Sequence, residues 1–160
     1  MISQDELKET YDNQGYVVCE DLLSGEFVAD LKTVTNNLVT AAGDMKAGDE
    51  TYEFIGETKA SLPRLERINS PHKVHPIFDQ LIRKDEIMDI LRLLLGEDIR
   101  MQGSKLNLKL GGGSSAVEWH QDWAFYPHTN DDVLAVGIMI DDMASSNGPV
   151  MFVPGSHKGQ

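Results

Sequence analysis

The sequence predicts a mainly-β protein with N-terminal helices, an α+β fold, on the strength of three observations. Through residues 1–96, apolar residues mostly recur at the spacing of amphipathic helices. Residues 99–110 instead alternate with period two, as strands do. Beyond them, apolar runs of strand length alternate with turn signals, which indicates an antiparallel sheet, sandwich or barrel. The length suits one domain, so we expect a single domain over 1–160, mostly helical over 1–96 and stranded over 97–160.

Helices are predicted over 3–15, 24–43, 70–82 and 84–96. The first begins with a capping-box pattern, in which Ser3 precedes Glu6 by three residues, and Gly15 can end it. The last, "KDEIMDILRLLLG", has the clearest apolar side, and Asp85 is its candidate cap. Two prolines lead into the helix before it.

Strands are predicted at 16–20, 51–55, 99–110, 117–125, 133–140 and from residue 150. Within 99–110, Lys105, Asn107 and Lys109 share one face, and we expect both lysines to be exposed. The continuous apolar run "VLAVGIMI" at 133–140 is typical of a buried strand.

Charge and cysteine content restrict the classes of partner. The net charge of −12 would repel a phosphate backbone, so we expect no nucleic-acid partner. No run of about 18 apolar residues predicts a membrane span, and the acidic, polar N-terminus does not resemble a secretory signal. Cys19 alone forms no internal disulfide and excludes a cysteine-based zinc site. A cytoplasmic location is the simplest expectation.

The stretch "EWHQDWAFYPH", residues 118–128, is the candidate metal site. On a regular strand, His120 and Asp122 project to one face and Gln121 to the other. One imidazole and one carboxylate can share a metal ion, and a second histidine would complete the facial triad that leaves open positions on Fe(II). A His-x-Asp pair on its own also fits a solvent-facing ion pair or hydrogen bond.

The ordered motifs "KLNLK", "GGGS", "WHQD", "NGP" and "PGSH" resemble those of the phytanoyl-CoA dioxygenase family of Fe(II)- and 2-oxoglutarate-dependent oxygenases. The resemblance covers about residues 60–160 well and the earlier part loosely. It implies a double-stranded β-helix (a cupin-like jelly roll) with N-terminal helices packed on it. It also implies that O₂ and 2-oxoglutarate are consumed, with release of succinate and CO₂, to hydroxylate a small-molecule substrate.

The same resemblance implies roles for five residues. His120 and Asp122 match two of the three iron ligands. Asn107 matches a position that contacts 2-oxoglutarate, and Tyr126 matches an aromatic position near it. Gln121, between the ligands, is also near the co-substrate in some members of the family.

Other polar and aromatic residues are given less specific roles. Arg64 and Arg67 in "LPRLERI" are candidates for binding a substrate or co-substrate carboxylate, because arginine makes bidentate pairs. A surface charge on a helix or loop is the equal alternative. Trp119 and Trp123 are expected to be core residues rather than pocket residues.

The remaining histidines are expected outside the iron site. His72 and His75 lie beside prolines and should be structural, whereas His128 should cap its loop or line a substrate entrance. His157, in "PGSH", matches a turn that lies away from the iron in the family.

The resemblance also implies further strands, carrying a second iron histidine and then an arginine for 2-oxoglutarate, and neither follows "PGSH" within residues 1–160. A fragment or truncated family member is the favoured explanation. A compact variant that pairs its sheet edge with a second copy, as a homodimer, is one alternative, and a noncatalytic metal- or small-molecule-binding jelly roll is another. A zinc hydrolase using His120 and Asp122 would need further ligands at motif spacing.

Overall fold

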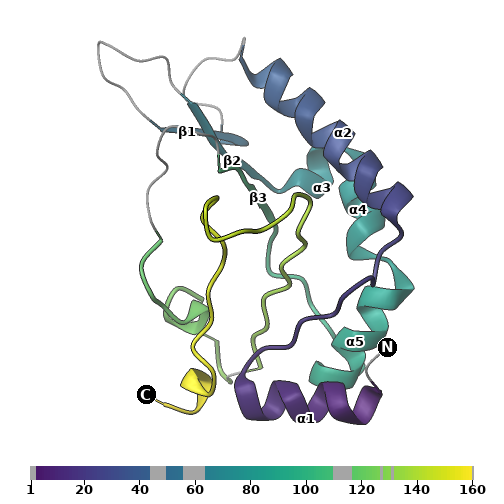
Figure 1. Ribbon diagram of the computed structural model, residues 1–160, viewed down its shortest axis with the longest axis vertical. Coiled ribbons are helices and arrows are strands. Elements are labelled where there is room, and N and C mark those ends of the chain that lie inside the picture. Colours follow the sequence, from purple (N-terminus) through teal and green to yellow (C-terminus); the bar gives the residue numbers. More distant parts are fainter. Residues whose placement is uncertain are drawn as a thin grey trace. The chain divides into compact units, whose positions relative to one another are not determined.

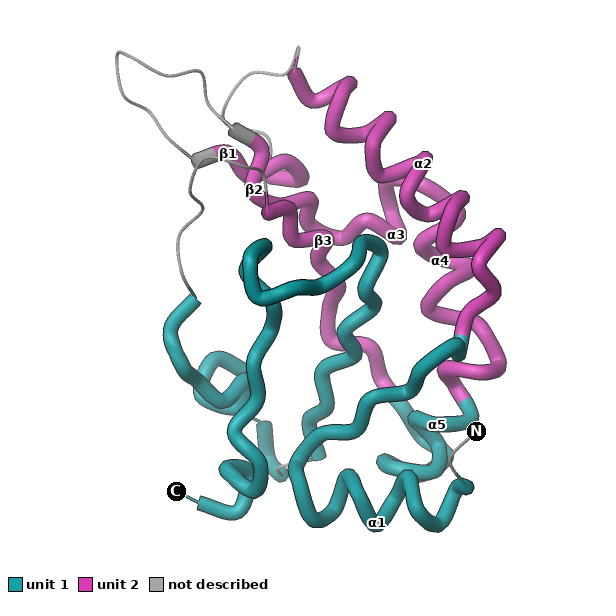
Figure 2. Tube along the Cα trace, viewed as in Figure 1, with its two compact units in different colours: residues 1–22, 89–99, 116–160 teal, residues 23–88, 100–115 magenta. Residues whose placement is uncertain are grey.

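The computed structural model describes residues 3–43, 50–55, 64–109, 117–126, 128–130 and 132–159 (Figure 1). The elements follow in the order α1 (Gln4–Gln14), α2 (Gly25–Ala42), β1 (Tyr52–Ile55), β2 (Arg64–Asn69), α3 (Pro71–Val74), α4 (Pro76–Ile82), α5 (Asp85–Leu95), β3 (Lys105–Asn107), η1 (Asp122–Ala124) and η2 (Ser156–Lys158). Contacts divide the chain into two compact units (Figure 2). Unit 1 comprises residues 1–22, 89–99 and 116–160, and unit 2 comprises residues 23–88 and 100–115.

The first helix, in unit 1, begins and ends where local chemistry predicts. The Ser3 hydroxyl accepts a hydrogen bond from the Glu6 amide at 3.3 Å, and the Glu6 carboxylate accepts one from the Ser3 amide at 3.0 Å. Both halves of the capping box are therefore present. Gly15 ends the helix in the left-handed region, with φ of 81°, where a residue without Cβ carries little strain.

In unit 2, α2 follows its predicted range, whereas the next predicted helix is divided in two. Ser24 caps α2 through a 3.2 Å bond from the Phe27 amide, and Leu31 on this helix is fully buried. The prolines start two helices, α3 and α4, rather than one. His75 caps α4 by accepting from the Ile77 amide at 3.3 Å.

His72 has a structural partner as well, since its Nδ1 lies 2.6 Å from the Ser104 hydroxyl. The predicted structural roles of His72 and His75 are therefore confirmed. Asp85 lies in the first turn of α5 instead of capping it.

Unit 2 also holds a three-stranded antiparallel sheet in the order β1-β2-β3. Its core consists of the buried Ala42, Tyr52, Leu65 and Ile68, against which Leu106 and Leu108 pack. The alternation predicted for 99–110 holds over 105–109, where both lysines are exposed and the two leucines are half-buried. Strand β2 was not predicted, because "RLERIN" was interpreted as a helix or loop.

In the part of the chain that the structure describes, most of the residues predicted to form strands do not do so. Among the described residues, β3 is the last strand, and it covers only three residues of 99–110. Residues 16–20, 133–140 and 150–153 are irregular, and 117–126 contain a 3₁₀ turn, η1. Strand composition alone does not make a sheet, because a strand is stabilised by hydrogen-bonded neighbours and a covered face.

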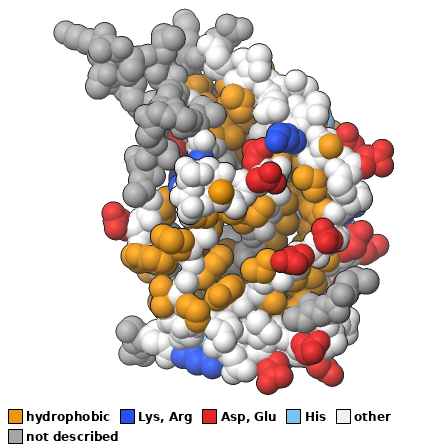
Figure 3. Space-filling view, in the orientation of Figure 1, with side chains coloured by type: hydrophobic (Ala, Val, Ile, Leu, Met, Phe, Trp, Pro, Cys, Tyr) orange, Lys and Arg blue, Asp and Glu red, His pale blue; other side chains and the backbone are white. Residues whose placement is uncertain are grey.

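The side chains in this part of unit 1 accordingly stay in solvent. Trp119 is 64% exposed and Trp123 is 46% exposed, so the expectation that they are core residues is wrong. Other exposed apolar residues in the unit include Val136, Met151, Phe152 and Val153. Figure 3 shows hydrophobic side chains gathered on the face in view. No helix within the described ranges has both the length and the apolar character needed to cross a membrane.

Candidate metal centre

His120 and Asp122 lie together in unit 1, with 3.3 Å between Nε2 of the imidazole and Oδ1 of the carboxylate. Their side chains are 36% and 41% exposed, so the pair is open to solvent and to ions. The chain is extended at Gln121 and then turns into η1 at Asp122. The approach therefore depends on an extended residue followed by a turn, not on the regular strand that the sequence predicted.

A hydrogen bond sets which nitrogen of His120 faces Asp122. Nδ1 lies 2.7 Å from the Glu118 carbonyl oxygen, which can only accept, so Nδ1 carries the hydrogen. A neutral ring then directs the Nε2 lone pair at the carboxylate. Two acceptors at this distance repel unless a proton or a cation lies between them. Metal-binding histidines typically donate their other N–H to a carbonyl or carboxylate in this way.

Phe125 holds the imidazole from one side and was missed by the sequence analysis. Its ring meets that of His120 edge to face, with centroids 5.3 Å apart and planes at 83°. The η1 turn places it there, since the Phe125 amide donates to the Asp122 carbonyl at 2.9 Å. The sequence signal was an aromatic residue three positions after Asp122. Phe125 reaches the imidazole of His120 only because the chain turns between Asp122 and Phe125.

Tyr126 follows on the same turn. Its amide donates to the Asp122 carbonyl at 3.1 Å, and its side chain is 39% exposed. Trp123 fixes the next stretch of chain, because its indole N–H donates to the Asn130 carbonyl at 3.1 Å. The residue predicted to lie near the co-substrate is therefore tethered to a metal-ligand candidate through the backbone.

Gln121 contacts the turn at 154–159. Its Nε2 donates to the Ser156 carbonyl at 3.0 Å and lies 3.4 Å from the Gly159 carbonyl. Because both partners are acceptors, the amide nitrogen must be the end that faces them. The amide oxygen Oε1 is the end that remains for a ligand.

Asn107 lies in unit 2 on β3, exposed, opposite Arg67 of β2. Its Oδ1 accepts from Arg67 Nε at 3.0 Å, and Arg67 Nη1 also pairs with Glu53 of β1 at 3.1 Å. These three side chains form a polar row across the sheet. Arg67 is thus engaged within the protein, and the Asn107 amide is oriented with its nitrogen away from the guanidinium. Arg64 begins β2, and its side chain lies outside the described part.

The other histidines do not join the pair. His157 Nε2 donates to the Asp12 carbonyl at 3.1 Å, and His128 is exposed. Over the described ranges, no cluster of three or more His, Cys, Asp or Glu residues could hold a metal ion. The site therefore brings together the two ligands that the sequence predicted.

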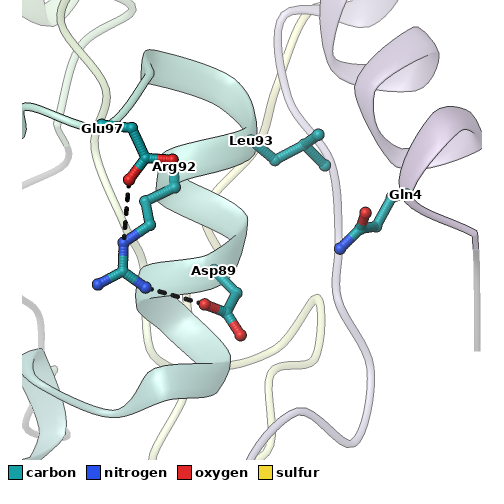
Figure 4. A pocket seen from close by; sticks show the side chains of 5 residues that line it. All are labelled: Gln4, Asp89, Arg92, Leu93 and Glu97. Carbon is teal, nitrogen blue, oxygen red and sulfur yellow. Dashed lines mark hydrogen bonds and ion pairs between the residues drawn. The ribbon is translucent and has the colours of Figure 1, made fainter.

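A shallow, open hollow of about 240 Å³ also lies in unit 1, lined by Gln4, Asp89, Arg92, Leu93 and Glu97 (Figure 4). Arg92 pairs there with Asp89 at 2.9 Å and lies 4.0 Å from Glu97. The guanidinium is therefore matched by nearby carboxylates. None of the predicted site residues lines this hollow.

Solved structures share the fold. EctD from S. alaskensis with bound Fe matches with a TM-score of 0.65 and 27% identity, over 78% of this chain and 42% of that chain. AviO1 from Streptomyces viridochromogenes Tue57 matches with a TM-score of 0.64 and 20% identity, over 76% and 56%, and this likeness shows the fold alone. The class is therefore that of EctD-like α+β proteins.

The family Phytanoyl-CoA dioxygenase (PhyH) matches residues 11–160, and the chain belongs to this family. The resemblance inferred from the sequence motifs is confirmed. A "Probable alpha-ketoglutarate-dependent hypophosphite dioxygenase" of Stutzerimonas stutzeri is 40% identical over 155 residues, 97% of this chain and 54% of the relative. An "Ectoine dioxygenase" of Sphingopyxis alaskensis is 28% identical over 92% of this chain and 48% of the relative. The chain spans about half the length of these curated relatives.

Proposed function

We propose that this chain functions in an Fe(II)- and 2-oxoglutarate-dependent dioxygenase reaction on a small molecule. The observation that carries the proposal is the 3.3 Å approach of His120 Nε2 to Asp122 Oδ1, with the other ring nitrogen bonded to the Glu118 carbonyl. Membership of the phytanoyl-CoA dioxygenase family and the names of its relatives support it. The double-stranded β-helix of the family is the framework that we propose for the complete site.

The donor set fits Fe(II). An imidazole and a carboxylate are two members of the 2-His-1-carboxylate triad, and Nε2 and Oδ1 lie 3.3 Å apart, near enough to share one metal ion. A further histidine would complete the triad, and the part of the chain that the structure describes brings none to the pair. When bound, iron with 2-oxoglutarate supplies the activation of O₂ for hydroxylation.

We assign the remaining roles to residues that can orient the co-substrate. Asn107 would donate from Nδ2 to a 2-oxoglutarate carboxylate, since its Oδ1 is already occupied by Arg67. Tyr126 would pack beside the co-substrate. Gln121, whose amide nitrogen donates to the Ser156 carbonyl, would hold the peptide between His120 and Asp122 in place near it. Arg67 thereby acts on the co-substrate through Asn107, a different role from the direct carboxylate contact that the sequence suggested.

The proposed substrate class is a small hydrophilic molecule. The relatives named above are described as acting on hypophosphite and on ectoine, both small and polar.

Anaerobic titration of the chain with Fe(II) and 2-oxoglutarate tests this function. The expected result is a visible metal-to-ligand charge-transfer band, followed by succinate formation when O₂ is admitted. H120A and D122A should abolish the band, whereas H128A and D98A, which replace exposed residues of the same types, should retain it. A chain that shows neither band nor succinate contradicts the proposal.

The same titration distinguishes the proposed dioxygenase from the alternative, a noncatalytic metal- or small-molecule-binding protein. That protein would bind metal through His120 without forming succinate.

The proposed homodimer would pair β3, which has one hydrogen-bonded neighbour in the described sheet, with β3 of a second copy. Light scattering that returns the monomer mass at working concentration would exclude it.

A further inference from the structure

The turn at residues 154–159, called here the PGSH turn, lies against the C-terminal end of α1. The Gly155 amide donates to the Gln14 carbonyl at 2.8 Å, and His157 Nε2 donates to the Asp12 carbonyl at 3.1 Å. Carbonyls in the last turn of a helix have no partner within the helix. The PGSH turn therefore supplies donors to the end of α1, although about 140 residues of sequence separate the two.

The fit between the two segments is close. A Cβ added to Gly15 would collide with the imidazole of His157, so only glycine allows the ring to lie where it does. One residue further on, Tyr16 stacks on Phe152, with ring centroids 4.7 Å apart and planes at 12°. Hydrogen bonds, ring stacking and steric fit thus place the PGSH turn on α1.

The other side of the PGSH turn holds the metal-ligand pair. Gln121, the residue between His120 and Asp122, donates to the Ser156 carbonyl at 3.0 Å. The described residues 117–126 belong to no strand, and both ligand side chains are more than a third exposed. The position of the pair therefore depends on a few specific contacts, and the bond from Gln121 links it to the rest of unit 1.

We propose that the PGSH turn is a bracket between α1 and the metal-ligand pair, in which His157 and Gly15 act as positioning residues for His120 and Asp122. This inference rests on the proposed function. Anchoring through Asp12, Gln14 and Gly15 holds the PGSH turn, and Gln121 transfers that anchoring to the peptide that joins the two ligands. His157 thus has a part in the site without belonging to the metal shell.

Co(II) binding tests the bracket, because the visible spectrum of bound Co(II) reports ligand geometry directly. H157L removes the donor to Asp12, and we expect about 10-fold weaker Co(II) binding with a changed visible band, as for residues that orient metal ligands. H157Q should restore both, because its amide nitrogen can reach the position of Nε2. Q121L should resemble H157L.

Two glycines provide the matched control. G15A and G96A both place a side chain in the left-handed region, at φ of 81° and 92°. At Gly15 the new Cβ meets His157, whereas at Gly96 it meets nothing within 4 Å. G15A should therefore weaken Co(II) binding and G96A should not, with circular dichroism confirming that each variant is folded.

The outcomes show whether the bracket or the proposed function is wrong. If Co(II) binding by the native chain requires His120 but folded H157L and Q121L keep its affinity and spectrum, the bracket is wrong and the function stands. If Co(II) binding does not require His120, the proposed function is wrong. The ¹⁵N shifts of His120 in the metal-free protein then decide the bracket: native-like shifts in H157L overturn it, and loss of the Nδ1–H tautomer supports it.

Discussion

Arg67 and Asn107 face each other across paired antiparallel strands, and Arg67 Nε donates to Asn107 Oδ1 at 3.0 Å. A guanidinium has only donors, so it selects the oxygen end of the amide and turns the nitrogen away. Glu53 on the next strand holds the guanidinium through a 3.1 Å ion pair. Under the proposed function, Asn107 held in this way would donate from Nδ2 to 2-oxoglutarate.

Arg67 should therefore govern co-substrate affinity and leave metal affinity unchanged. R67Q removes the charged donor, and we expect the Kd for 2-oxoglutarate to rise about 3- to 10-fold, as for a lost hydrogen bond of about 1 kcal/mol. Titration in the presence of Mn(II) measures it. The control is R100Q, at an exposed arginine, and an equal effect of both substitutions would contradict the orienting role.

Asp122 should bind metal through its charge as well as its shape. D122N keeps the size of the side chain but removes the carboxylate, so Fe(II) affinity should fall by at least about 10-fold. Isothermal titration calorimetry with Mn(II), which avoids oxidation, gives the comparison. Unchanged affinity in D122N would mean that this carboxylate is not a ligand.

Gly15 should be more sensitive to substitution than Gly96. Both substitutions incur about 1 kcal/mol for a left-handed non-glycine residue, and G15A adds the collision with His157. Urea unfolding should show a greater loss of stability in G15A than in G96A. Equal losses would mean that the PGSH turn moves aside without cost.

The capping box should make α1 sensitive to acid. Hydrogen bonds from the Ser3 amide and then from its hydroxyl lower the pKa of Glu6 below its ordinary value of 4.5. A lowered carboxyl pKa stabilises the folded state above the unfolded value and loses that contribution as pH falls through the folded value. S3A should cost about 1 kcal/mol at neutral pH. Because it removes the hydroxyl and keeps the amide, it should lessen the loss of stability below about pH 4.5 without abolishing it, as measured by urea unfolding across pH.

Ile68 should carry much of the stability of unit 2. It is fully buried between β1 and β3, so I68A should cost about 2–5 kcal/mol through lost burial and the cavity left behind. V18A, at a residue that is 66% exposed, is the control and should change stability by less than about 0.5 kcal/mol. Denaturant melts of the two variants provide the comparison, and similar midpoints would contradict this assignment of the core.

Sequence reasoning succeeded where the signal was local. The capping box at Ser3 and the helix end at Gly15 were both predicted, because each depends on residues within one turn of helix. The alternation around Asn107 also held, since neighbouring side chains of an extended chain face opposite sides. Strand β2 was missed because four charged or amide side chains in "RLERIN" obscured its period.

By itself, the sequence determined the helix ends and the family, because caps and motifs are properties of short segments. It placed His120 and Asp122 on one face of a regular strand, but their 3.3 Å approach depends on the η1 turn that the structure shows. Only the tertiary structure showed that Gln121 donates a hydrogen bond to the PGSH turn, that Phe125 packs on the imidazole and that Arg67 orients Asn107. It also showed that segments with strand composition beyond β3 stay irregular in the described residues. These contacts join residues that are distant in sequence or separated by a turn. Strand pairing depends on which neighbouring strands are within reach, and no local sequence pattern specifies those neighbours.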